Sequence, residues 1–276
     1  VDSAAKLETL KAEAAKHGLP LAETLAVGDG ANDIPMITAA GLGVGYYPHP
    51  SAGAAAAVIR HHDLTALLWC SIDNDDSRDL DQLTAIEPVN HREVRLFVAI
   101  ADVDALVKKG TPIDAHARHN TTSVYTSARV LPRLPERLCT DLTSLNPDQD
   151  RLAVVVEMLF SDDGILTGSA IYRAIVRNKA QLAYDAVSDW IEGEGELPGP
   201  ARRVEGMGAQ LRWQDDLAQK LRVLRRAQGS LEFETFQPRA LFQGERITAI
   251  RQQPQNRARQ LIEEFMIATN GCTTRF

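Results

Sequence analysis

Cysteine is scarce in this chain of 276 residues, and the three that it has lie far apart. Cys70, Cys139 and Cys272 show none of the short spacings that bind zinc or that frame a disulfide-rich domain. The cysteine pattern therefore favours a reducing cytoplasm, in which the three thiols are simply buried.

Long apolar runs are also missing from the sequence. No stretch approaches the roughly 18 residues that a membrane helix needs, and no signal peptide opens the chain. With 44% hydrophobic and 24% charged residues, the composition is close to that of an ordinary globular protein. We therefore expect no membrane contact, and nothing in the sequence indicates an obligate protein partner.

The third absence is a surplus of positive charge. The chain has 30 Lys and Arg against 37 Asp and Glu, for a net charge of −7. Neither part of it is basic, since there are 4 cations against 7 anions before Trp69 and 26 against 30 after it. If this protein binds nucleic acid, it must do so through a local cationic channel and not through a broadly basic surface.

The first part of the chain alternates between helical and strand-like segments. Apolar spacing at Leu7, Leu10 and Ala14 predicts a helix over residues 4–15. Further segments favour strands at 24–28 and 42–46 and helices at 34–40 and 51–59. This alternation predicts a partial, Rossmann-like α/β layer over residues 1–68. Because it makes only half of such a sheet, we expect it to be the end of a larger domain.

From Cys70 onwards, acidic loops alternate with long strand-like runs, and helices follow. The pattern predicts strands at 94–101, 152–160 and 170–176 and helices at 182–191, 207–227 and from 256 to about 269. A stretch rich in Gly and Pro at 193–200 indicates a loop. We therefore predict an α+β protein with two domains, at residues 1–68 and 69–276.

The densest chemistry lies between Ser71 and Gln82, where five carboxylates fall within nine residues: Asp73, Asp75, Asp76, Asp79 and Asp81. Such crowding is costly unless solvent or a cation neutralises it. Hard oxygen ligands suit Mg²⁺ or Mn²⁺. Asp79 and Asp81 are two residues apart, so in extended chain both point to one side.

The acidic stretch has two other interpretations. A solvated acidic loop explains the spacing alone about as well as a metal site does. A calcium-binding loop does not fit, because its sixth position needs glycine and holds Arg78, while its twelfth needs glutamate and holds Thr84.

The acidic stretch resembles the catalytic signature of the RNB domain of the ribonuclease II and ribonuclease R family, in which Ile-Asp precedes Asp-x-Asp-Asp. Further segments resemble that family in the right order, at residues 97–102, 131–132, 138–145, 177–184 and 256–264. The resemblance covers essentially all of residues 69–276. It implies a mixed α+β catalytic core that degrades single-stranded RNA from its 3′ end to nucleoside monophosphates.

The resemblance also implies a site for two-metal hydrolysis of a phosphodiester, with Mg²⁺ or Mn²⁺ as cofactor. Asp73, Asp79 and Asp81 match family carboxylates, and Asp81 matches the residue most needed for cleavage. Gln82 departs from the common pattern, which has a fourth aspartate at that position. An amide coordinates through its oxygen but supplies no charge, so we expect the second ion to be weaker or held differently.

The same resemblance assigns the residues that would hold single-stranded RNA, which is gripped by aromatic stacking and by cations on its phosphates. Tyr125, Tyr184 and Phe233 match family aromatics that stack on the terminal nucleotides. From the sequence alone, however, core packing is the favoured interpretation of Tyr184 and Phe233. Cations and carboxylates of the last predicted helix complete the set: Arg257, Arg259 and one of Glu263 and Glu264, which ordinary helix-surface charge explains nearly as well.

A second motif, Val27-Gly-Asp-Gly-Ala-Asn-Asp-Ile-Pro-Met36, resembles the metal-binding motif of haloacid-dehalogenase-type phosphatases, most narrowly the phosphoserine phosphatases. Lys6 matches their phosphate-balancing lysine, and Asp29 and Asp33 match their Mg²⁺ ligands. Their aspartate nucleophile has no counterpart before Lys6. We therefore expect a phosphatase remnant without activity.

Three functional hypotheses follow: a metal-dependent 3′→5′ exoribonuclease, a phosphoserine phosphatase remnant, and a catalytically idle RNA-binding module. Family members normally continue well past Phe276, so we expect the ribonuclease domain to be incomplete. Because of Gln82 and this missing segment, the catalytically idle RNA-binding module stays an open hypothesis.

Overall fold

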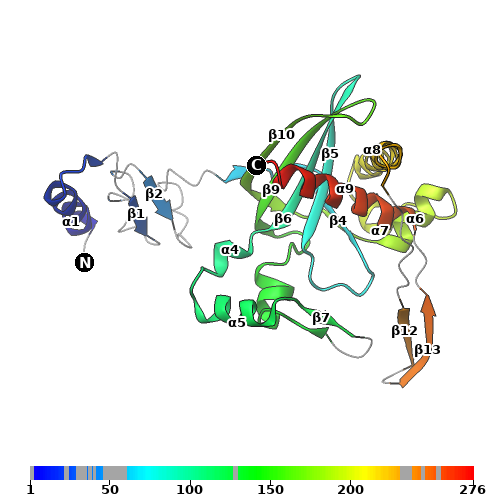
Figure 1. Cartoon of the computed structure of the whole chain (residues 1–276), viewed down its shortest axis with the longest axis horizontal. Coiled ribbons are helices and arrows are strands. Elements are labelled where there is room, and N and C mark those ends of the chain that lie inside the picture. Colours follow the sequence, from blue (N-terminus) through cyan, green and yellow to red (C-terminus); the bar gives the residue numbers. More distant parts are fainter. Residues whose placement is uncertain are drawn as a thin grey trace. The chain divides into compact units, whose positions relative to one another are not determined.

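The computed structural model describes residues 3–21, 25–28, 36, 39, 42–45, 61–126, 130–230, 238–243, 246–252 and 256–276. The chain divides into two compact units, Val1–His61 and His62–Phe276 (Figure 1). The division falls earlier than the expected boundary after residue 68. The reason is that β3 (His62–Asp63) pairs with a strand of the second unit, and the indole of Trp69 donates to the carbonyl of Leu64 over 2.8 Å.

The first unit contains α1 (Ser3–Lys16), β1 (Leu25–Gly28) and β2 (Leu42–Gly45). The two strands pair in parallel, with Leu25 opposite Leu42. This confirms the predicted first helix and the predicted parallel strands. The helix expected at 51–59 lies outside the described residues, as does most of that at 34–40.

The second unit is built on a seven-stranded sheet with the order β11-β4-β5-β6-β9-β10-β3. The strands that follow β3 are β4 (Cys70–Asp73), β5 (Gln82–Asn90), β6 (Glu93–Ala101), β9 (Asp150–Ser161), β10 (Leu166–Arg177) and β11 (Ala180–Ala183). The four central pairings are antiparallel, and the pairings at the two edges, β11 with β4 and β10 with β3, are parallel. The mixed sheet confirms the predicted α+β class.

Both faces of this sheet carry a hydrophobic core, because successive side chains of a strand point to opposite faces. In β6, Leu96 and Val98 join the core on one face, while Phe97 and Ala99 join the core on the other. Strands buried on both faces give continuous apolar runs. This explains why β6 and β9 were recognisable in the sequence.

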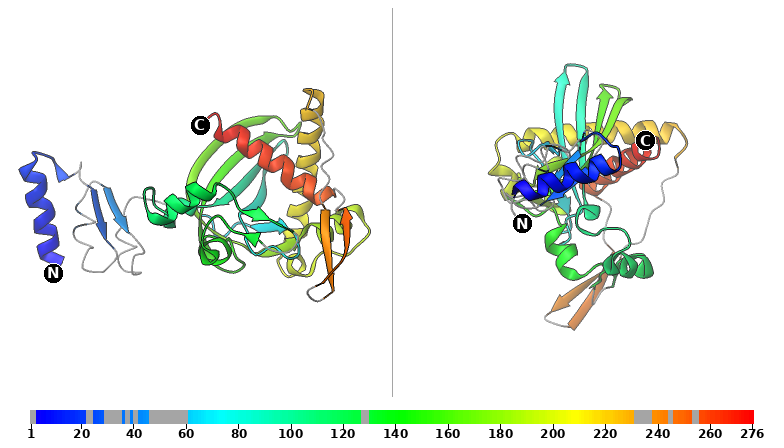
Figure 2. Two further views of the ribbon diagram at one scale, coloured as in Figure 1. Left: turned by 60° about the horizontal axis from the view of Figure 1, so that its bottom comes forward. Right: turned by 90° about the vertical axis from the view of Figure 1, so that its left-hand side faces the viewer.

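Helices cover one of the two faces (Figure 2). They are α6 (Tyr184–Glu192), α7 (Gly199–Arg202), α8 (Met207–Ala227) and α9 (Arg257–Thr273). The bounds of α8 are those predicted from the sequence. Helix α6 begins later than expected, because Leu182 and Ala183 pair with Ile72 and Asp73 as part of β11.

Two buried glutamines fix α8 against the sheet. Gln210 accepts from the backbone N–H of Ile86 over 2.9 Å and donates to the carbonyl of Leu68 over 2.7 Å. Gln214 accepts from the Thr84 hydroxyl over 2.8 Å. Because buried polar groups are costly unless they are bonded, these contacts favour one register of helix on sheet.

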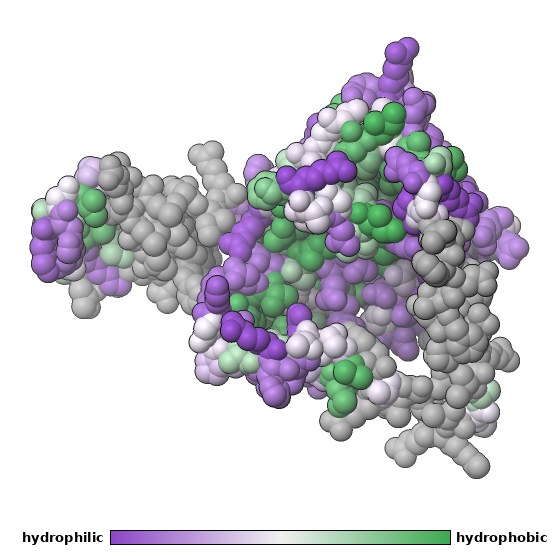
Figure 3. Space-filling view, in the orientation of Figure 1, coloured by the Kyte–Doolittle hydropathy of each residue, from purple (hydrophilic) through white to green (hydrophobic). Residues whose placement is uncertain are grey.

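Between β6 and β9 the chain leaves the sheet and forms short elements. They are α4 (Val103–Leu106), α5 (Pro112–Asn120), β7 (Val124–Tyr125), β8 (Val130–Leu131) and a π-helical turn, η3 (Leu138–Leu142). A separate hairpin, β12 (Pro238–Gln243) with β13 (Arg246–Gln252), precedes α9. On the face drawn in Figure 3, hydrophobic side chains of the second unit form separate patches bordered by hydrophilic ones. Among the helices that are described, none is long and apolar enough to span a membrane.

Candidate active site

The acidic motif forms the end of β4 and the loop that leads to β5. Asp73 is the last residue of β4, and in the parallel pairing with β11 it lies opposite Ala183. Its carboxylate accepts from the backbone N–H of Asn74 over 2.7 Å. Parallel strands end at the same edge of a sheet, so Asp73 lies beside the start of α6, where Tyr184 follows Ala183.

The other end of the loop is held by the segment after η3. Leu80 is buried, its N–H donates to the Ser144 hydroxyl over 3.0 Å, and its carbonyl accepts from the N–H of Leu145 over 2.9 Å. The carbonyl of Asp81 accepts from the N–H of Ala101 over 3.0 Å. Residues on either side of the carboxylates are therefore fixed by backbone and hydroxyl contacts.

Buried Asn178, which lies between β10 and β11, strengthens the same frame. Its side chain donates to the Ser71 hydroxyl over 3.0 Å and to the carbonyl of Leu145 over 3.1 Å. Asn178 belongs to the motif at 177–184, and Ser144 to the motif at 138–145. Both motifs thus bond to the backbone or side chains that flank the acidic loop.

The charges of Asp73, Asp79 and Asp81 act on one another. Desolvation, then the negative charges of Asp79 and Asp73, raise the pKa of Asp81 to about 6. Desolvation is also the main cause of the raised pKa of Asp73, and the charge of Asp79 adds to it. The negative charges of neighbouring predicted ligands thus add to the raised pKa values of Asp73 and Asp81, and a bound cation would stabilise these charges.

The three carboxylates are neighbours without forming a ready-made coordination shell. Among the described residues, no three Asp, Glu, His or Cys side chains already lie together at metal-binding spacing. Asp75 and Asp76 are exposed, and Asp75 lines a separate pocket. Gln82 opens β5 and is half-buried. Coordination by these groups stays a prediction.

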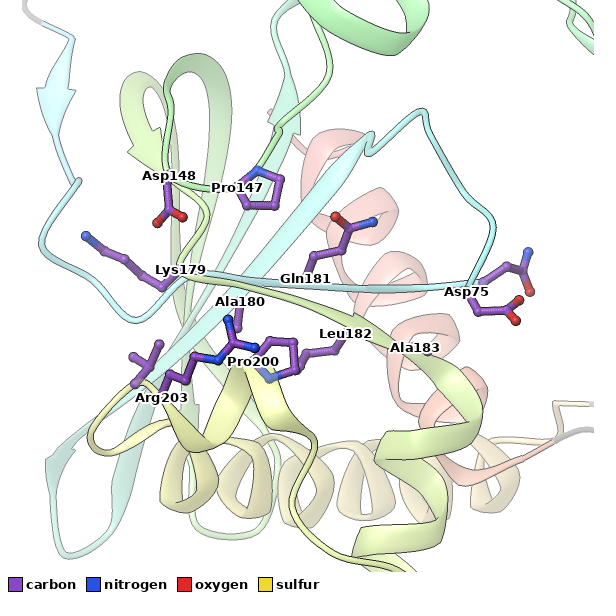
Figure 4. A pocket seen from close by; sticks show the side chains of 12 residues that line it. Asp75, Pro147, Asp148, Lys179, Ala180, Gln181, Leu182, Ala183, Pro200 and Arg203 are labelled. Carbon is purple, nitrogen blue, oxygen red and sulfur yellow. The ribbon is translucent and has the colours of Figure 1, made fainter.

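That separate pocket, of about 620 Å³, runs along the edge strand β11 (Figure 4). Asn74 and Asp75 line it beside Gln181, and Lys179 and Arg203 contribute cations. Asp73, Asp79 and Asp81 do not line it. The pocket therefore adjoins the acidic loop without including the predicted metal ligands.

Tyr184 and Arg259 lie together beside Asp73. The guanidinium carbon of Arg259 lies 4.5 Å from the centre of the Tyr184 ring, and its Nη2 donates to Asn74 Oδ1 over 2.6 Å. Desolvation, followed by the charge of Asp73, raises the pKa of Tyr184 to about 12, while Arg259 opposes the shift. Both predicted RNA-binding residues are thus adjacent to the predicted metal site, although Tyr184 also packs against the core.

Arg257, in contrast, has a structural partner. Its guanidinium forms two hydrogen bonds, of 2.7 and 2.8 Å, with the Asp215 carboxylate of α8. The expected phosphate position at the start of α9 is also filled, since the Asn256 side chain accepts from the N–H of Arg259 over 2.9 Å. In this structure Arg257 therefore ties α9 to α8, and a phosphate contact by Arg257 stays a prediction.

The two predicted glutamates of α9 differ in their surroundings. Glu264 is 4% exposed and its carboxylate is bound by Arg225, with the shortest contact at 2.6 Å. Glu263 is about half exposed and lies 3.8 Å from the same guanidinium. The structure thus gives Glu264 a buried ion pair, and a ribose contact stays a prediction that Glu263 fits better.

Several predicted residues fall outside what the structure describes. Phe233, Asp29 and Asp33 are among them, and for Tyr125 only the backbone pairing with Val130 is described. Lys6 lies on α1, half-buried. Their roles stay predictions.

The structure adds residues that the sequence reasoning did not single out. Asn74 binds both Asp73, through its N–H, and Arg259, through its side chain. The charge of Arg133 acts on Asp81. Asn74 lies inside the acidic motif, and Arg133 directly follows the Leu-Pro motif. Closeness to these motifs in the sequence is therefore the signal that could have identified both residues.

Comparison with known proteins gives matches in both units. Residues 2–46 match the family model of a haloacid dehalogenase-like hydrolase, and residues 61–276 match the model of the RNB domain. Ribonuclease R of Escherichia coli is 38% identical over 215 residues, which are 78% of this chain and 26% of that protein. Exoribonuclease 2 of Cronobacter sakazakii is 33% identical over 221 residues, 79% of this chain and 34% of that protein.

A solved structure agrees with these matches. Mycoplasma genitalium RNase R in complex with ribose-methylated single-stranded RNA superposes with a TM-score of 0.71 at 29% identity, covering 77% of this chain and 32% of that one. The chain thus spans about a quarter to a third of the relatives that it matches. Because the RNB model covers most of the chain, and because the acidic loop, Tyr184 and Arg259 lie at one edge of the sheet, this protein belongs to the RNB domain family.

Proposed function

We propose that this chain carries the catalytic site of a metal-dependent 3′→5′ exoribonuclease, which hydrolyses single-stranded RNA to nucleoside monophosphates in the cytoplasm. The observation that carries the proposal is that the charges of Asp79 and Asp73 act on Asp81 and that the charge of Asp79 acts on Asp73. Tyr184 and Arg259 lie beside them at the same edge of the sheet. Carboxylates with an adjacent aromatic and cation are what a nuclease for single strands requires.

The site fits a hard divalent cation such as Mg²⁺ or Mn²⁺. Its donors are carboxylate oxygens and the amide oxygen of Gln82, which are ligand types that these ions prefer. Desolvation is the main cause of the raised pKa values of Asp73 and Asp81, and the negative charges of neighbouring aspartates add to it. When bound there, the cation would activate water and stabilise the charge that develops on the phosphate and on the leaving oxygen.

The residues of the chain would divide the remaining work. The carboxylates of Asp73, Asp79 and Asp81 orient the attacking water towards phosphorus. As the P–O3′ bond breaks, the leaving 3′ oxygen takes up a proton, and a nucleoside 5′-monophosphate separates from the shortened strand. Tyr184 would stack on a terminal base, and Arg259 would place its charge near a phosphate.

End-labelled RNA tests this proposal directly. The purified chain is incubated with 3′-labelled or 5′-labelled single-stranded RNA in Mg²⁺, in Mn²⁺ and in EDTA. A 3′→5′ exonuclease releases labelled mononucleotide first from 3′-labelled RNA and shortens 5′-labelled RNA stepwise, and EDTA abolishes both. Internal fragments from either substrate would contradict an exonuclease.

A second candidate, an idle RNA-binding module, has one specific observation in its favour, which is the neutral Gln82 among the predicted ligands. RNA binding without cleavage in the same assay would support it. The phosphatase remnant predicts no turnover of phosphoserine. Turnover that is lost in Asp29→Asn would reverse that view.

A further inference from the structure

The backbone of Arg259 is fixed on helix α6. Asn256 caps α9, since its Oδ1 accepts from the N–H of Arg259 over 2.9 Å. The Nδ2 of the same side chain donates to the carboxylate of Asp185 over 2.7 Å. Asp185 directly follows Tyr184, the first residue of α6. The first turns of the two helices are therefore joined, and this junction brings the Arg259 side chain beside the Tyr184 ring.

The guanidinium of Arg259, in contrast, is held from the acidic loop. Its Nη2 donates to Asn74 Oδ1 over 2.6 Å, and its central carbon lies 4.5 Å from the centre of the Tyr184 ring. Its Nε is buried and has no hydrogen-bond partner among the described residues. A buried donor without a partner is costly, so Nε does not favour this position of the side chain. The hydrogen bond to Asn74 and the contact with the ring are what favour it.

An amide oxygen holds the Arg259 guanidinium, whereas a carboxylate holds that of Arg257. Arg257 forms two hydrogen bonds with Asp215, so the two opposite charges cancel within that pair. Within the described part of the chain, Arg259 forms no ion pair with a carboxylate. An amide accepts a hydrogen bond without supplying negative charge. Asn74 therefore fixes the guanidinium of Arg259 without cancelling its positive charge.

The side chain of Asn74 can be changed without removing the main-chain contacts of the acidic loop. Its backbone N–H donates to the Asp73 carboxylate over 2.7 Å, and its backbone carbonyl accepts from the N–H of Ser77 over 3.3 Å. Both contacts use main-chain atoms of Asn74, so neither depends on its side chain. The side-chain bond to Arg259 is thus a separate connection between the acidic loop and α9, which substitution of Asn74 tests.

We propose that Asn74 is a positioning residue, which holds the charged guanidinium of Arg259 beside the acidic loop so that it binds a phosphate of single-stranded RNA. This inference rests on the proposed nuclease function and specifies how the site holds its substrate. A guanidinium forms charge-assisted hydrogen bonds with phosphate, and these are about twice as strong as neutral ones. A carboxylate in place of the Asn74 amide would hold the guanidinium as well, but it would compete with the phosphate for its charge.

The salt dependence of RNA affinity tests the phosphate contact. Labelled single-stranded RNA is titrated in EDTA over a range of salt concentrations. Arg259→Gln and Asn74→Asp should each bind about tenfold more weakly, the lower end for a hydrogen bond to a charged group. In both, the slope of log affinity against log salt should fall by about 0.7, the change for one lost phosphate contact on a single strand. Asn90→Asp, the same substitution at an exposed turn, should keep the wild-type slope. Wild-type slopes in Arg259→Gln or in Asn74→Asp overturn the contact.

A double-mutant cycle tests whether Asn74 acts through Arg259. Asn74→Ala keeps the charge of Arg259 but frees its guanidinium, which RNA must then immobilise, so affinity should fall about threefold. In the Arg259→Gln background, Asn74→Ala should cause no further loss. In cleavage assays the loss should appear in KM far more than in kcat. Asn90→Ala is the control, because Asn90 also accepts a hydrogen bond through Oδ1, from the N–H of Arg92 over 2.8 Å. Unchanged affinity in Asn74→Ala, or equal losses in the two backgrounds, overturns the positioning role.

The position of the guanidinium can also be measured without RNA. The Nε–H of Arg259 is buried, so its nuclear magnetic resonance signal should exchange slowly with water in the wild type and at least several-fold faster in Asn74→Ala. Slow exchange in Asn74→Ala would overturn the positioning role, whatever the chain does with RNA. A wild-type chain that binds RNA in EDTA but never cleaves it would refute the proposed nuclease alone, because the affinity experiments would still decide the phosphate contact.

Discussion

Arg259 connects Tyr184 to the acidic loop, because its guanidinium lies 4.5 Å from the centre of the tyrosine ring and also donates to Asn74 over 2.6 Å. Asn74 in turn donates its N–H to Asp73. A residue predicted to hold RNA is thereby linked, through two hydrogen bonds and one cation–π contact, to a residue predicted to hold metal. The guanidinium covers one face of the ring, so a terminal base cannot stack on that face while this contact persists.

Loss of the Tyr184 ring should therefore weaken RNA binding. We expect Tyr184→Ala to cost about 1–3 kcal/mol of affinity, the range for one base–aromatic stack. Tyr184→Phe keeps the ring and should stay close to the wild type. The measurement is a titration of labelled single-stranded RNA in EDTA, with thermal unfolding of both variants to separate lost stacking from lost core packing. Phe233→Ala should resemble Tyr184→Ala.

The pair of Glu264 with Arg225 should contribute mainly to stability. Removing one partner of a buried ion pair costs about 3–5 kcal/mol, and because Arg225 is 23% exposed we expect Glu264→Gln near the lower end. Glu263→Gln, at the adjacent exposed position, should change stability by less than about 0.5 kcal/mol. Urea unfolding of the two variants measures both. Equal and small effects would show that the ion pair is not a structural contact.

The fold was largely predictable where apolar periodicity was strong. Residues 207–227 and the strands β6, β9 and β10 were placed to within about four residues, because their apolar runs are nearly continuous, whereas β5 was not predicted. Strand β11 was missed, since its four residues Ala180–Ala183 run directly into α6 and look like its first turn. The pairing with β4 that makes them a strand is a contact between distant parts of the chain, which local pattern does not contain.

The site was predictable by residue type but not by partner. The aspartates follow from their spacing, and Tyr184 and Arg259 from the family motifs. Nothing in the sequence showed that Arg257 would pair with Asp215 or Glu264 with Arg225, because each partner lies about 40 residues away on α8. Asn74 and Arg133 stand out only in the structure, because there Asn74 bonds to both Asp73 and Arg259 and the charge of Arg133 acts on Asp81.

The raised pKa of Asp81 has a consequence for stability. Its pKa is about 6 in the folded chain against an ordinary value of 3.8, so between these values the native state binds more protons than the unfolded state. Stability of the metal-free chain should then fall as pH rises through this window. Asp81→Asn should raise the melting temperature in EDTA at pH 7–8, with the difference vanishing near pH 4. Added Mg²⁺ should raise the melting temperature of the wild type more than that of the variant. A variant that is less stable than the wild type at every pH would contradict the assignment.

The same substitution separates chemistry from binding. If Asp81 organises the attack on phosphorus, Asp81→Asn should abolish cleavage while RNA affinity stays close to that of the wild type. An amide keeps the shape of the carboxylate and removes one negative charge, so the stacking and phosphate contacts elsewhere survive. Cleavage rates in Mg²⁺ are measured beside titrations with labelled single-stranded RNA.

Asp76→Asn is the matched control for that experiment, since it makes the same change at an exposed position of the same loop and should retain full cleavage. A parallel loss of binding and cleavage in Asp81→Asn would mean that Asp81 supports the fold of the loop, and the proposed mechanism would be wrong. Full retention of cleavage would be equally decisive against it, because Asp81 would then not be needed for the attack on phosphorus.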